Sequence, residues 1–210
     1  MGKVRVRGFA VSIDGYAAGP NQSLNNPMGE GGRDLHRWFY PTRTFRSMLG
    51  QDGGTDDRFA RATAEGFGAF ILGRNMFGPA GDNWGGPDWK GWWGDNPPYH
   101  APTFILTHHA RDPIEIEGGT TFHFVTDGIE AALAQAKAAA GDLDVKIGGG
   151  AATVRQYLLK GAIDELHLAV SPVVLGRGES LYSGIDLPGL GYRVTEVIPT
   201  DLATHLVLTR

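Results

Sequence analysis

A run of three glycines at 148–150 carries the residue types needed to hold an anion. It follows the apolar stretch 145–147, and a helix is predicted to begin directly after it. Glycine lets a phosphate approach the backbone closely, while the free amides and the dipole of a helix N-terminus favour negative charge. The alternative is a glycine-rich connection that only lets a helix pack on a sheet, because the run matches neither GxGxxG nor a P-loop. The predicted anion-binding residues are Gly148, Gly149, Gly150, Ala151, Ala152 and Thr153.

Two other predicted strands end in residues that suit a phosphate. Gly73, Arg74 and Asn75 follow the apolar stretch 69–72, and a guanidinium can bind a phosphate through two parallel hydrogen bonds. Thr107 and His108 follow the stretch 103–106. Taken singly, Arg74 could be a surface charge and His108 a solvated loop residue. Together with the glycine run they place three phosphate-binding features at one sheet edge, which suits a cofactor with a diphosphate and a separate 2′-phosphate.

Strands that alternate with helices must position these residues. Strands are predicted at 3–12, 69–72, 103–106, 121–125, 145–147 and 165–173, with a terminal hairpin at 192–198 and 204–209. Helices are predicted at 34–39, 55–66, 128–140 and 151–160. This order predicts an α/β fold with three layers, α/β/α, in which a mostly parallel central sheet ends in an antiparallel C-terminal hairpin. Ligands of such a sheet bind beyond the carboxyl ends of its strands.

The segment 78–102 breaks this pattern. It gathers Trp84, Trp89, Trp92, Trp93 and Tyr99 among glycines and prolines, with neither a helical nor a strand period. A loop of this length in a compact domain is usually functional or forms an interface, and clustered tryptophans present much apolar surface. We expect either a flap over a pocket or a structural or subunit-contact loop.

Length and composition favour one globular domain over residues 1–210. The chain has 41% hydrophobic and 20% charged residues, and its formal net charge of −4 argues against a nucleic-acid partner. It contains no cysteine, and its seven histidines show no zinc-binding spacing, so no metal site is predicted. No apolar run approaches the roughly 20 residues of a membrane span, and no signal peptide is recognisable, so we expect a cytoplasmic protein without membrane contact.

The order of these segments resembles the dihydrofolate reductase fold. It is closest to the reductase family that includes the C-terminal domain of the bifunctional riboflavin-biosynthesis deaminase/reductase. The resemblance covers essentially the whole chain and rests on FAVSIDGYAAG, FILGRNMF, TFILTHH, VKIGGGAATVRQYL and DELHLAVSPVVLGRGESLY. Two positions depart from the family, since Met76 stands where dihydrofolate reductases usually have Thr and Tyr16 where riboflavin reductases have Lys.

The resemblance implies NADPH as the cofactor and a homodimer as the assembly. On this resemblance, Gly73, Arg74, Thr107 and His108 would surround the adenosine end of NADPH. The residues from Gly148 to Thr153 would hold its pyrophosphate. The backbone near Ala10 would face the nicotinamide.

A pterin-like substrate also needs a carboxylate that binds its ring N–H groups and helps to protonate the reduced ring. Asp14 follows the first strand, and Asp34 lies in the DLHRWF segment, which resembles a helix of dihydrofolate reductases. Both are candidate catalytic and substrate-binding residues, with Tyr16 and Trp38 as further substrate contacts. The alternatives are a turn aspartate that caps loop amides for Asp14 and a charge at a helix N-terminus for Asp34.

These features predict an NADPH-dependent oxidoreductase that transfers hydride to a small heteroaromatic substrate, pterin-like or pyrimidine-like. The bond reduced would be of the CH–NH or C=N type. The alternative is a non-catalytic protein of the same fold that binds a nucleotide or a heteroaromatic ligand. The two hypotheses differ in whether NADPH is consumed or only bound.

Overall fold

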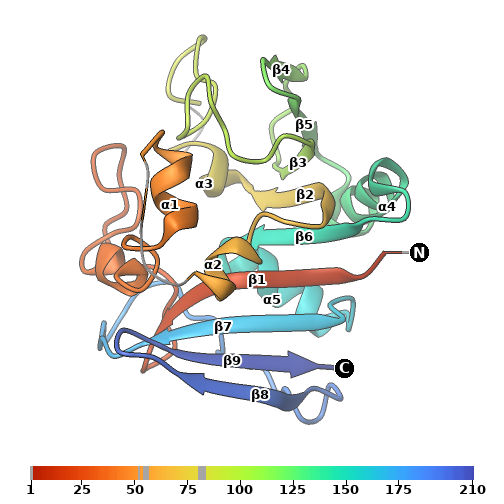
Figure 1. Ribbon diagram of the computed structural model, residues 1–210. Helices are drawn as coiled ribbons and strands as arrows, with labels where there is room; N and C mark the ends of the chain where they lie inside the picture. The colour runs from red at the N-terminus through yellow and green to blue at the C-terminus, as the bar shows by residue number, and fades with distance from the viewer. Residues whose placement is uncertain (1, 52, 54–56, 80–83) are drawn as a thin grey trace.

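A single twisted sheet organises the chain (Figure 1). The computed structural model describes residues 2–51, 53, 57–79 and 84–210, and within these residues nine strands pair in the order β4-β5-β3-β2-β6-β1-β7-β9-β8. The six strands from β5 to β7 in this order run parallel, whereas β4 and β9 pair antiparallel with their neighbours. The strands are β1 Val4–Ser12, β2 Phe67–Gly73, β3 Pro102–Leu106, β4 Ile114–Ile116, β5 Thr120–Val125, β6 Asp144–Gly149, β7 Glu165–Ser171, β8 Arg193–Pro199 and β9 Thr204–Thr209.

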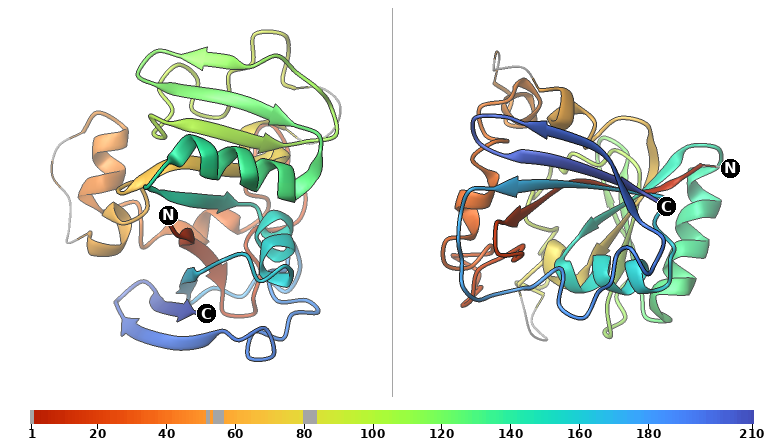
Figure 2. Two further views of the ribbon diagram at one scale, coloured as in Figure 1. Left: turned by 90° about the vertical axis from the view of Figure 1, so that its right-hand side faces the viewer. Right: turned by 90° about the horizontal axis from the view of Figure 1, so that it is seen from below.

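Helices cover both faces of this sheet (Figure 2). α4 (Gly128–Ala140) and α5 (Ala151–Leu159) lie on one face. The 3-10 helix η1 (Gly32–His36) and the short helices α1 (Arg43–Met48) and α2 (Arg58–Arg61) lie on the other, and α3 (Arg74–Phe77) follows β2 directly. The predicted three-layer α/β/α fold with a mostly parallel sheet and an antiparallel C-terminal hairpin is confirmed.

The two-residue period of β1 separates an apolar face from a charged one. Val4 and Val6 are buried in the core beneath α4 and α5. Arg5 and Arg7 alternate with them, and Arg7 forms an ion pair with Glu165 of the neighbouring strand β7. The face of the sheet opposite α5 is therefore lined by polar groups near β1, and the candidate site makes use of this face.

The position of α5 is fixed by its buried side. Val154, Tyr157 and Leu158 are almost fully buried, and full burial of such side chains contributes about 1.5–3 kcal/mol each. The Tyr157 hydroxyl also donates to the carbonyl oxygen of Ile129 in α4, at 2.8 Å. These contacts hold the N-terminus of α5 at the carboxyl end of β6.

The tryptophan-rich segment packs against the molecule in its described part, residues 78–79 and 84–102. Trp84, Trp89 and Tyr99 cover an apolar cluster that includes Phe77 and Phe122. The indole Nε1 of Trp89 donates to the carbonyl oxygen of Phe77 at 2.9 Å. The segment thus packs as a cover over β2, β3 and β5, and its Trp93, Pro98 and Tyr99 also line a pocket.

The elements that the sequence did not predict are short. β4, α1 and α3 contain three, six and four residues, and the six residues of α1 include none that is buried. The predicted helix at 55–66 is wrong in extent, since α2 spans four residues, and its predicted start at Thr55 and Asp56 lies outside the described residues. No helix in the described part of the chain has the length and apolar character needed to cross a bilayer.

Candidate functional site

A central cavity of about 320 Å³ opens at the carboxyl ends of β1, β2 and β6. These strands are parallel neighbours, so their last residues meet at one edge of the sheet, where ligands of α/β proteins bind. β1 contributes one wall and the first turn of α5 the other. The predicted cofactor-binding residues on its walls are Ala10, Gly73, Arg74, Asn75, Gly148, Gly150, Ala151, Ala152 and Thr153.

A side cavity of about 310 Å³ adjoins the central one. Thr107 and His108, which follow β3, line this side cavity. Gly73, Arg74 and Thr153 line both cavities, so the two lie side by side across the ends of β3, β2 and β6. The three groups of residues that the sequence singled out therefore line two adjoining cavities.

The turn between β6 and α5 leaves room for an anion. A Cβ placed on Gly150 would meet no atom within 4 Å, so the space beside this residue is open. α5 begins directly after Gly150, and the first amides of a helix have no acceptor within the helix. The helix dipole adds positive potential at the same point. The residues present therefore fit the diphosphate of a dinucleotide.

The remaining glycines of this region allow close packing. Gly149 is buried behind the cavity wall with φ of 122°, and its peptide bond to Gly150 is cis. A Cβ on Gly149 would lie 3.1 Å from Cε2 of Phe9, and a Cβ on Gly73 would lie 2.4 Å from Oγ1 of Thr153. Gly149, predicted to bind the anion itself, is the buried last residue of β6 and is not among the residues that line the central cavity.

Arg74 lies where the central and side cavities meet, but its guanidinium also holds the tryptophan-rich segment. Its Cζ lies 4.2 Å from the ring centroid of Trp84, which is a cation–π contact. Nη1 donates a hydrogen bond to the carbonyl oxygen of Pro79. Arg74 is therefore placed both to reach a phosphate and to fix the fold of the loop.

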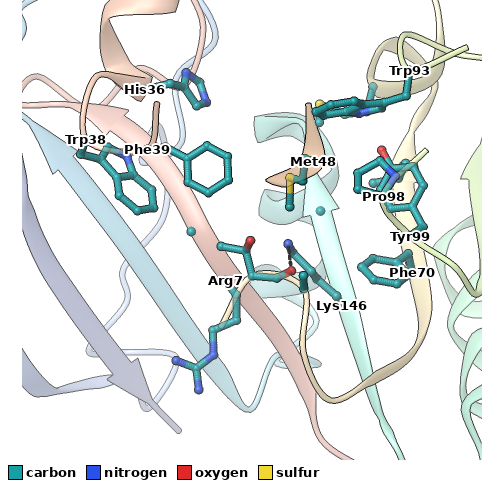
Figure 3. A pocket seen from close by; sticks show the side chains of 16 residues that line it. Arg7, His36, Trp38, Phe39, Met48, Phe70, Trp93, Pro98, Tyr99 and Lys146 are labelled. Carbon is teal, nitrogen blue, oxygen red and sulfur yellow. Dashed lines mark hydrogen bonds between the residues drawn. The ribbon is translucent and has the colours of Figure 1, made fainter. Parts of the chain in front are cut away.

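A third cavity, of about 210 Å³, lies between the sheet, α1 and the tryptophan-rich segment (Figure 3). We call it the lysine pocket, because Lys146 of β6 lies at its base. It adjoins the central cavity, and its mostly apolar walls include Trp38, one of the predicted substrate contacts. The residues that line both cavities are Gly8, His36, Met76 and Gly148.

His36 is the titratable residue on the shared wall of the central cavity and the lysine pocket. Its Nδ1 lies 3.4 Å from the carbonyl oxygen of Gly32, one turn earlier in η1. Burial lowers the pKa of the His36 imidazole from its ordinary value. The ring is therefore mainly neutral at pH 7, and its protonated form is a stronger acid than a solvated imidazolium.

Asp14 caps a loop rather than lining a cavity. Its carboxylate is exposed and accepts hydrogen bonds from the amides of Leu175, at 3.1 Å, and Gly176, at 2.7 Å. The Ser12 hydroxyl, followed by these amides, lowers the pKa of Asp14. Asp14 thus caps loop amides, as in the alternative to a catalytic role, but these amides belong to Leu175 and Gly176 and not to its own turn at Gly15.

Asp34 and Tyr16 also lie outside the walls of the three cavities. The Asp34 carboxylate is exposed and lies 2.8 Å from Nη2 of Arg37, three residues later. Tyr16 pairs with Ser180 in an isolated β-bridge, and its amide donates to Oγ of Ser12 at 2.9 Å. Of the four predicted substrate contacts, only Trp38 reaches a cavity wall.

Lys146 was not singled out in the sequence, although it is the one cation in the β6 segment DVKIGG. Its neighbours Val145 and Ile147 point into the main core, so the side chain of Lys146 points to the opposite face of the sheet. Burial, followed by repulsion from Arg7, lowers the pKa of Lys146 to about 7. The alternation of polar and apolar residues in β6, with a single cation at its centre, could have indicated this position from the sequence.

The described residues contain no group of three or more His, Cys, Asp or Glu side chains that could hold a metal ion.

Comparisons with known proteins agree with this architecture. The model of the family described as the RibD C-terminal domain matches residues 5–205. No curated protein matches the chain in sequence.

Three solved structures share the fold at low sequence identity. A chain from Shewanella sp. PV-4 assigned to riboflavin biosynthesis is 20% identical, with a TM-score of 0.58 and coverage of 100% of this chain and 99% of that one. The diaminohydroxyphosphoribosylaminopyrimidine deaminase/5-amino-6-(5-phosphoribosylamino)uracil reductase of Thermotoga maritima is 13% identical, with a TM-score of 0.56 and coverage of 99% of this chain and 56% of that one. Dihydrofolate reductase from Enterococcus faecalis, in a complex with NADP(H), is 16% identical, with a TM-score of 0.53 and coverage of 99% of this chain and 96% of that one.

The sheet order, the glycine turn at the N-terminus of α5 and the match over residues 5–205 lead to one assignment. The chain belongs to the RibD C-terminal domain family and has a dihydrofolate reductase-like fold.

Proposed function

We propose that this protein is an NADPH-dependent reductase of a small heteroaromatic compound of the pterin or pyrimidine type. The observation that carries the proposal is the row of three adjoining cavities, in which the central cavity shares lining residues with the side cavity and with the lysine pocket. One extended cofactor fits the first two cavities, and a small flat substrate fits the third. The Thermotoga protein is a 5-amino-6-(5-phosphoribosylamino)uracil reductase and the Enterococcus protein is a dihydrofolate reductase in a complex with NADP(H), which supports the same class.

The proposed cofactor contacts follow from the cavity walls. The amides of Ala151, Ala152 and Thr153 at the N-terminus of α5 would hold the diphosphate. Thr107 and His108 of the side cavity would contact the adenosine end. Arg74, Gly73 and Asn75 would lie between them, and the β1 backbone at Ala10 would face the nicotinamide.

NADPH, when bound, supplies a hydride, and the protein has to orient the substrate, exclude water and provide a proton. Reduction of a C=N bond to CH–NH consumes one hydride and one proton. We assign the proton to His36, because its ring lies on the wall between the central cavity and the lysine pocket. Asp14 and Asp34 line neither cavity.

Turnover separates this proposal from the alternative of a non-catalytic binding protein. NADPH binding would be measured by calorimetry, and NADPH oxidation by loss of absorbance with a panel of dihydropterins, pyrimidinediones and quinones. Oxidation that depends on one class of compound supports a reductase. Heat of NADPH binding and quenching of tryptophan fluorescence without any oxidation would instead establish a binding protein. No heat at millimolar NADPH would refute the cofactor assignment itself.

We also propose that residues 1–210 act as one domain and that the protein forms a homodimer. β8 lies at the edge of the sheet, and its Val194 and Val197 are 53% and 56% exposed. An exposed edge strand with apolar side chains is a surface that a second copy can cover. Light scattering gives the mass, and a monomer at micromolar concentration would contradict the proposal.

A further inference from the structure

The lysine pocket contains a cation whose hydrogen-bonding capacity is mostly unused. The Lys146 Nζ donates to the carbonyl oxygen of Thr63, the one acceptor among the described residues, whereas an ammonium group carries three donors. In Figure 3 the amine of Lys146 points into the space between Phe39, Met48 and Phe70. The pocket therefore offers free N–H groups to a ligand in an otherwise apolar space.

The walls of the lysine pocket bring no negative charge to this cation. Arg7 also lines the pocket, but its guanidinium points away from it and pairs with Glu165 (Figure 3). Burial raises the pKa of Tyr99 to about 12, so this phenol on the wall is neutral. Neither Asp nor Glu is among the residues that line the pocket. A ligand with an acceptor oxygen would therefore relieve the cost of the buried charge.

The shape of the pocket suits a flat ring. Phe39, Phe70, Trp93 and Tyr99 provide aromatic walls above Lys146, and stacking against such walls favours planar ligands. Gly148 lies two residues beyond Lys146 on the same face of β6 and lines both the pocket and the central cavity.

We propose that the lysine pocket binds a flat heteroaromatic compound through an oxo or oxyanion oxygen that accepts a hydrogen bond from Nζ of Lys146. This inference rests on the proposed function, because it identifies the substrate class of the reductase. It also sets a preference, since a ring that presents amino groups in place of oxo groups has N–H donors facing the lysine donor. Such a ring would need a carboxylate, which the walls of this pocket do not supply.

Two probes with one ring system test this preference. Pteridine-2,4-dione carries oxo groups where 2,4-diaminopteridine carries amino groups. Binding of each compound without cofactor would be measured by calorimetry and by quenching of tryptophan fluorescence, to which Trp93 on the wall contributes. At pH 6, below the pKa of about 7 of Lys146, the amine is mainly charged, and we expect the wild-type protein to bind the dione at least about tenfold more tightly, the size of one hydrogen bond to a charged donor.

Removing the charge should remove the preference. Lys146→Met keeps an unbranched side chain that is one atom shorter, and we expect it to lose about tenfold to a hundredfold in affinity for the dione and little for the diamine. Lys160→Met is the matched control, because Lys160 is exposed and pairs with Glu130 at 2.8 Å, away from the pocket. Lys146→Gln, which can still donate to Thr63, serves if the methionine variant unfolds on circular dichroism.

The outcomes separate this inference from the proposed function. Equal or inverted affinities of the wild-type protein for the two probes would overturn the inference, as would no binding of the dione at millimolar concentration. An unchanged preference in folded Lys146→Met or Lys146→Gln protein would also overturn it. NADPH binding is measured on the same preparations, so a protein that binds NADPH without preferring the dione is still a candidate reductase. If the protein prefers the dione through Lys146 but gives no heat with NADPH, the proposed ligand of the lysine pocket is supported and the assignment of NADPH as the cofactor is refuted.

Discussion

Nε2 of His167 lies 3.0 Å from Nδ1 of His205, and both imidazoles are buried side by side on the sheet face opposite α5. The amide of Gly8 donates to Nδ1 of His167 at 3.0 Å, so Nε2 carries the proton and donates to His205. Phe59 stacks on His205 with ring centroids 4.0 Å apart. Because Gly8 lines both the central cavity and the lysine pocket, this neutral pair fixes the β1 backbone at the site.

The histidine pair should make stability depend on pH. Burial lowers the pKa of His167 to about 3 and that of His205 to about 4, with the neighbouring ring, Arg7 and Lys146 adding to the shift at His167. In the unfolded chain a histidine takes up a proton near pH 6.5. In the folded protein the two rings stay neutral until the pH approaches their pKa values of about 4 and about 3. The free energy of unfolding is therefore highest above pH 6.5 and should fall by up to about 2.7 kcal/mol per pH unit below it.

Urea unfolding at pH 7.5, 6.0 and 5.0 measures this slope. His205→Asn keeps an acceptor for Nε2 of His167 and removes one of the two titrating rings. Loss of one ring should lower the slope by up to about 1.4 kcal/mol per pH unit relative to the wild-type protein. Equal slopes in the two proteins would show that other groups cause the acid sensitivity.

Arg74 should distinguish NADPH from NADH. Its side chain lies at the junction of the central and side cavities, where the additional phosphate of NADPH would meet the guanidinium. We expect Arg74→Ala to lower the affinity for NADPH by about tenfold or more, because a charge-assisted contact is lost. The affinity for NADH should fall less. Calorimetry with both nucleotides measures the difference.

Trp84→Leu is the control for the structural role of Arg74. It removes the cation–π contact at 4.2 Å and leaves the guanidinium in place. Its effect on NADPH and on NADH should therefore be the same. If Arg74→Ala lowers the affinities for both nucleotides equally, Arg74 stabilises the tryptophan-rich segment and does not bind the phosphate.

His36 should affect turnover more than binding. If its imidazolium supplies the proton, His36→Gln should lower kcat by about a hundredfold and leave the affinity for NADPH within about twofold. Because burial lowers the pKa of His36, the wild-type kcat should rise as the pH falls below 6.5, and the variant should lose this rise.

Asp14→Asn and Asp34→Asn provide the comparison for His36. Both carboxylates are exposed, and their partners are loop amides and Arg37. We expect each variant to keep kcat within about twofold of wild type. A loss comparable to that of His36→Gln in either variant would return the catalytic role to that carboxylate.

Local patterns were sufficient to predict most of the fold. Apolar stretches followed by glycine, as at 69–73 and 145–150, mark parallel strands, and their carboxyl ends meet at one edge of the sheet. The sites that depend on distant residues were harder to predict. The amides that bind Asp14 are 161 and 162 residues away in sequence, and the acceptor of Lys146 is 83 residues away. Contacts between residues so far apart produce no periodic pattern in the sequence. The sequence therefore could not distinguish a capping role of Asp14 from a catalytic one, and it did not indicate that Lys146 is buried.

Gly150 provides the sharpest test of the anion site at α5. Its backbone φ of −71° is one that any residue adopts, and a Cβ there would meet no atom within 4 Å. The Cβ of a Gly150→Val variant would therefore point into open space at the central cavity, where the diphosphate would lie, and would contact no protein atom. We expect Gly150→Val to lower the affinity for NADPH by about a hundredfold or more, since the added side chain blocks the approach of the diphosphate to the helix amides.

Two further variants control for the general effect of the added side chain. Ala138→Val adds the same kind of bulk to an exposed position of α4, and it should leave NADPH affinity and the unfolding midpoint nearly unchanged. Gly150→Ala adds one carbon and should cause a smaller loss of affinity than Gly150→Val. A graded loss from glycine to alanine to valine, with unfolding midpoints close to wild type, is the result expected if an anion approaches the backbone at this turn. Unchanged NADPH affinity in folded Gly150→Val protein would mean that the turn only joins β6 to α5 and that the diphosphate binds elsewhere.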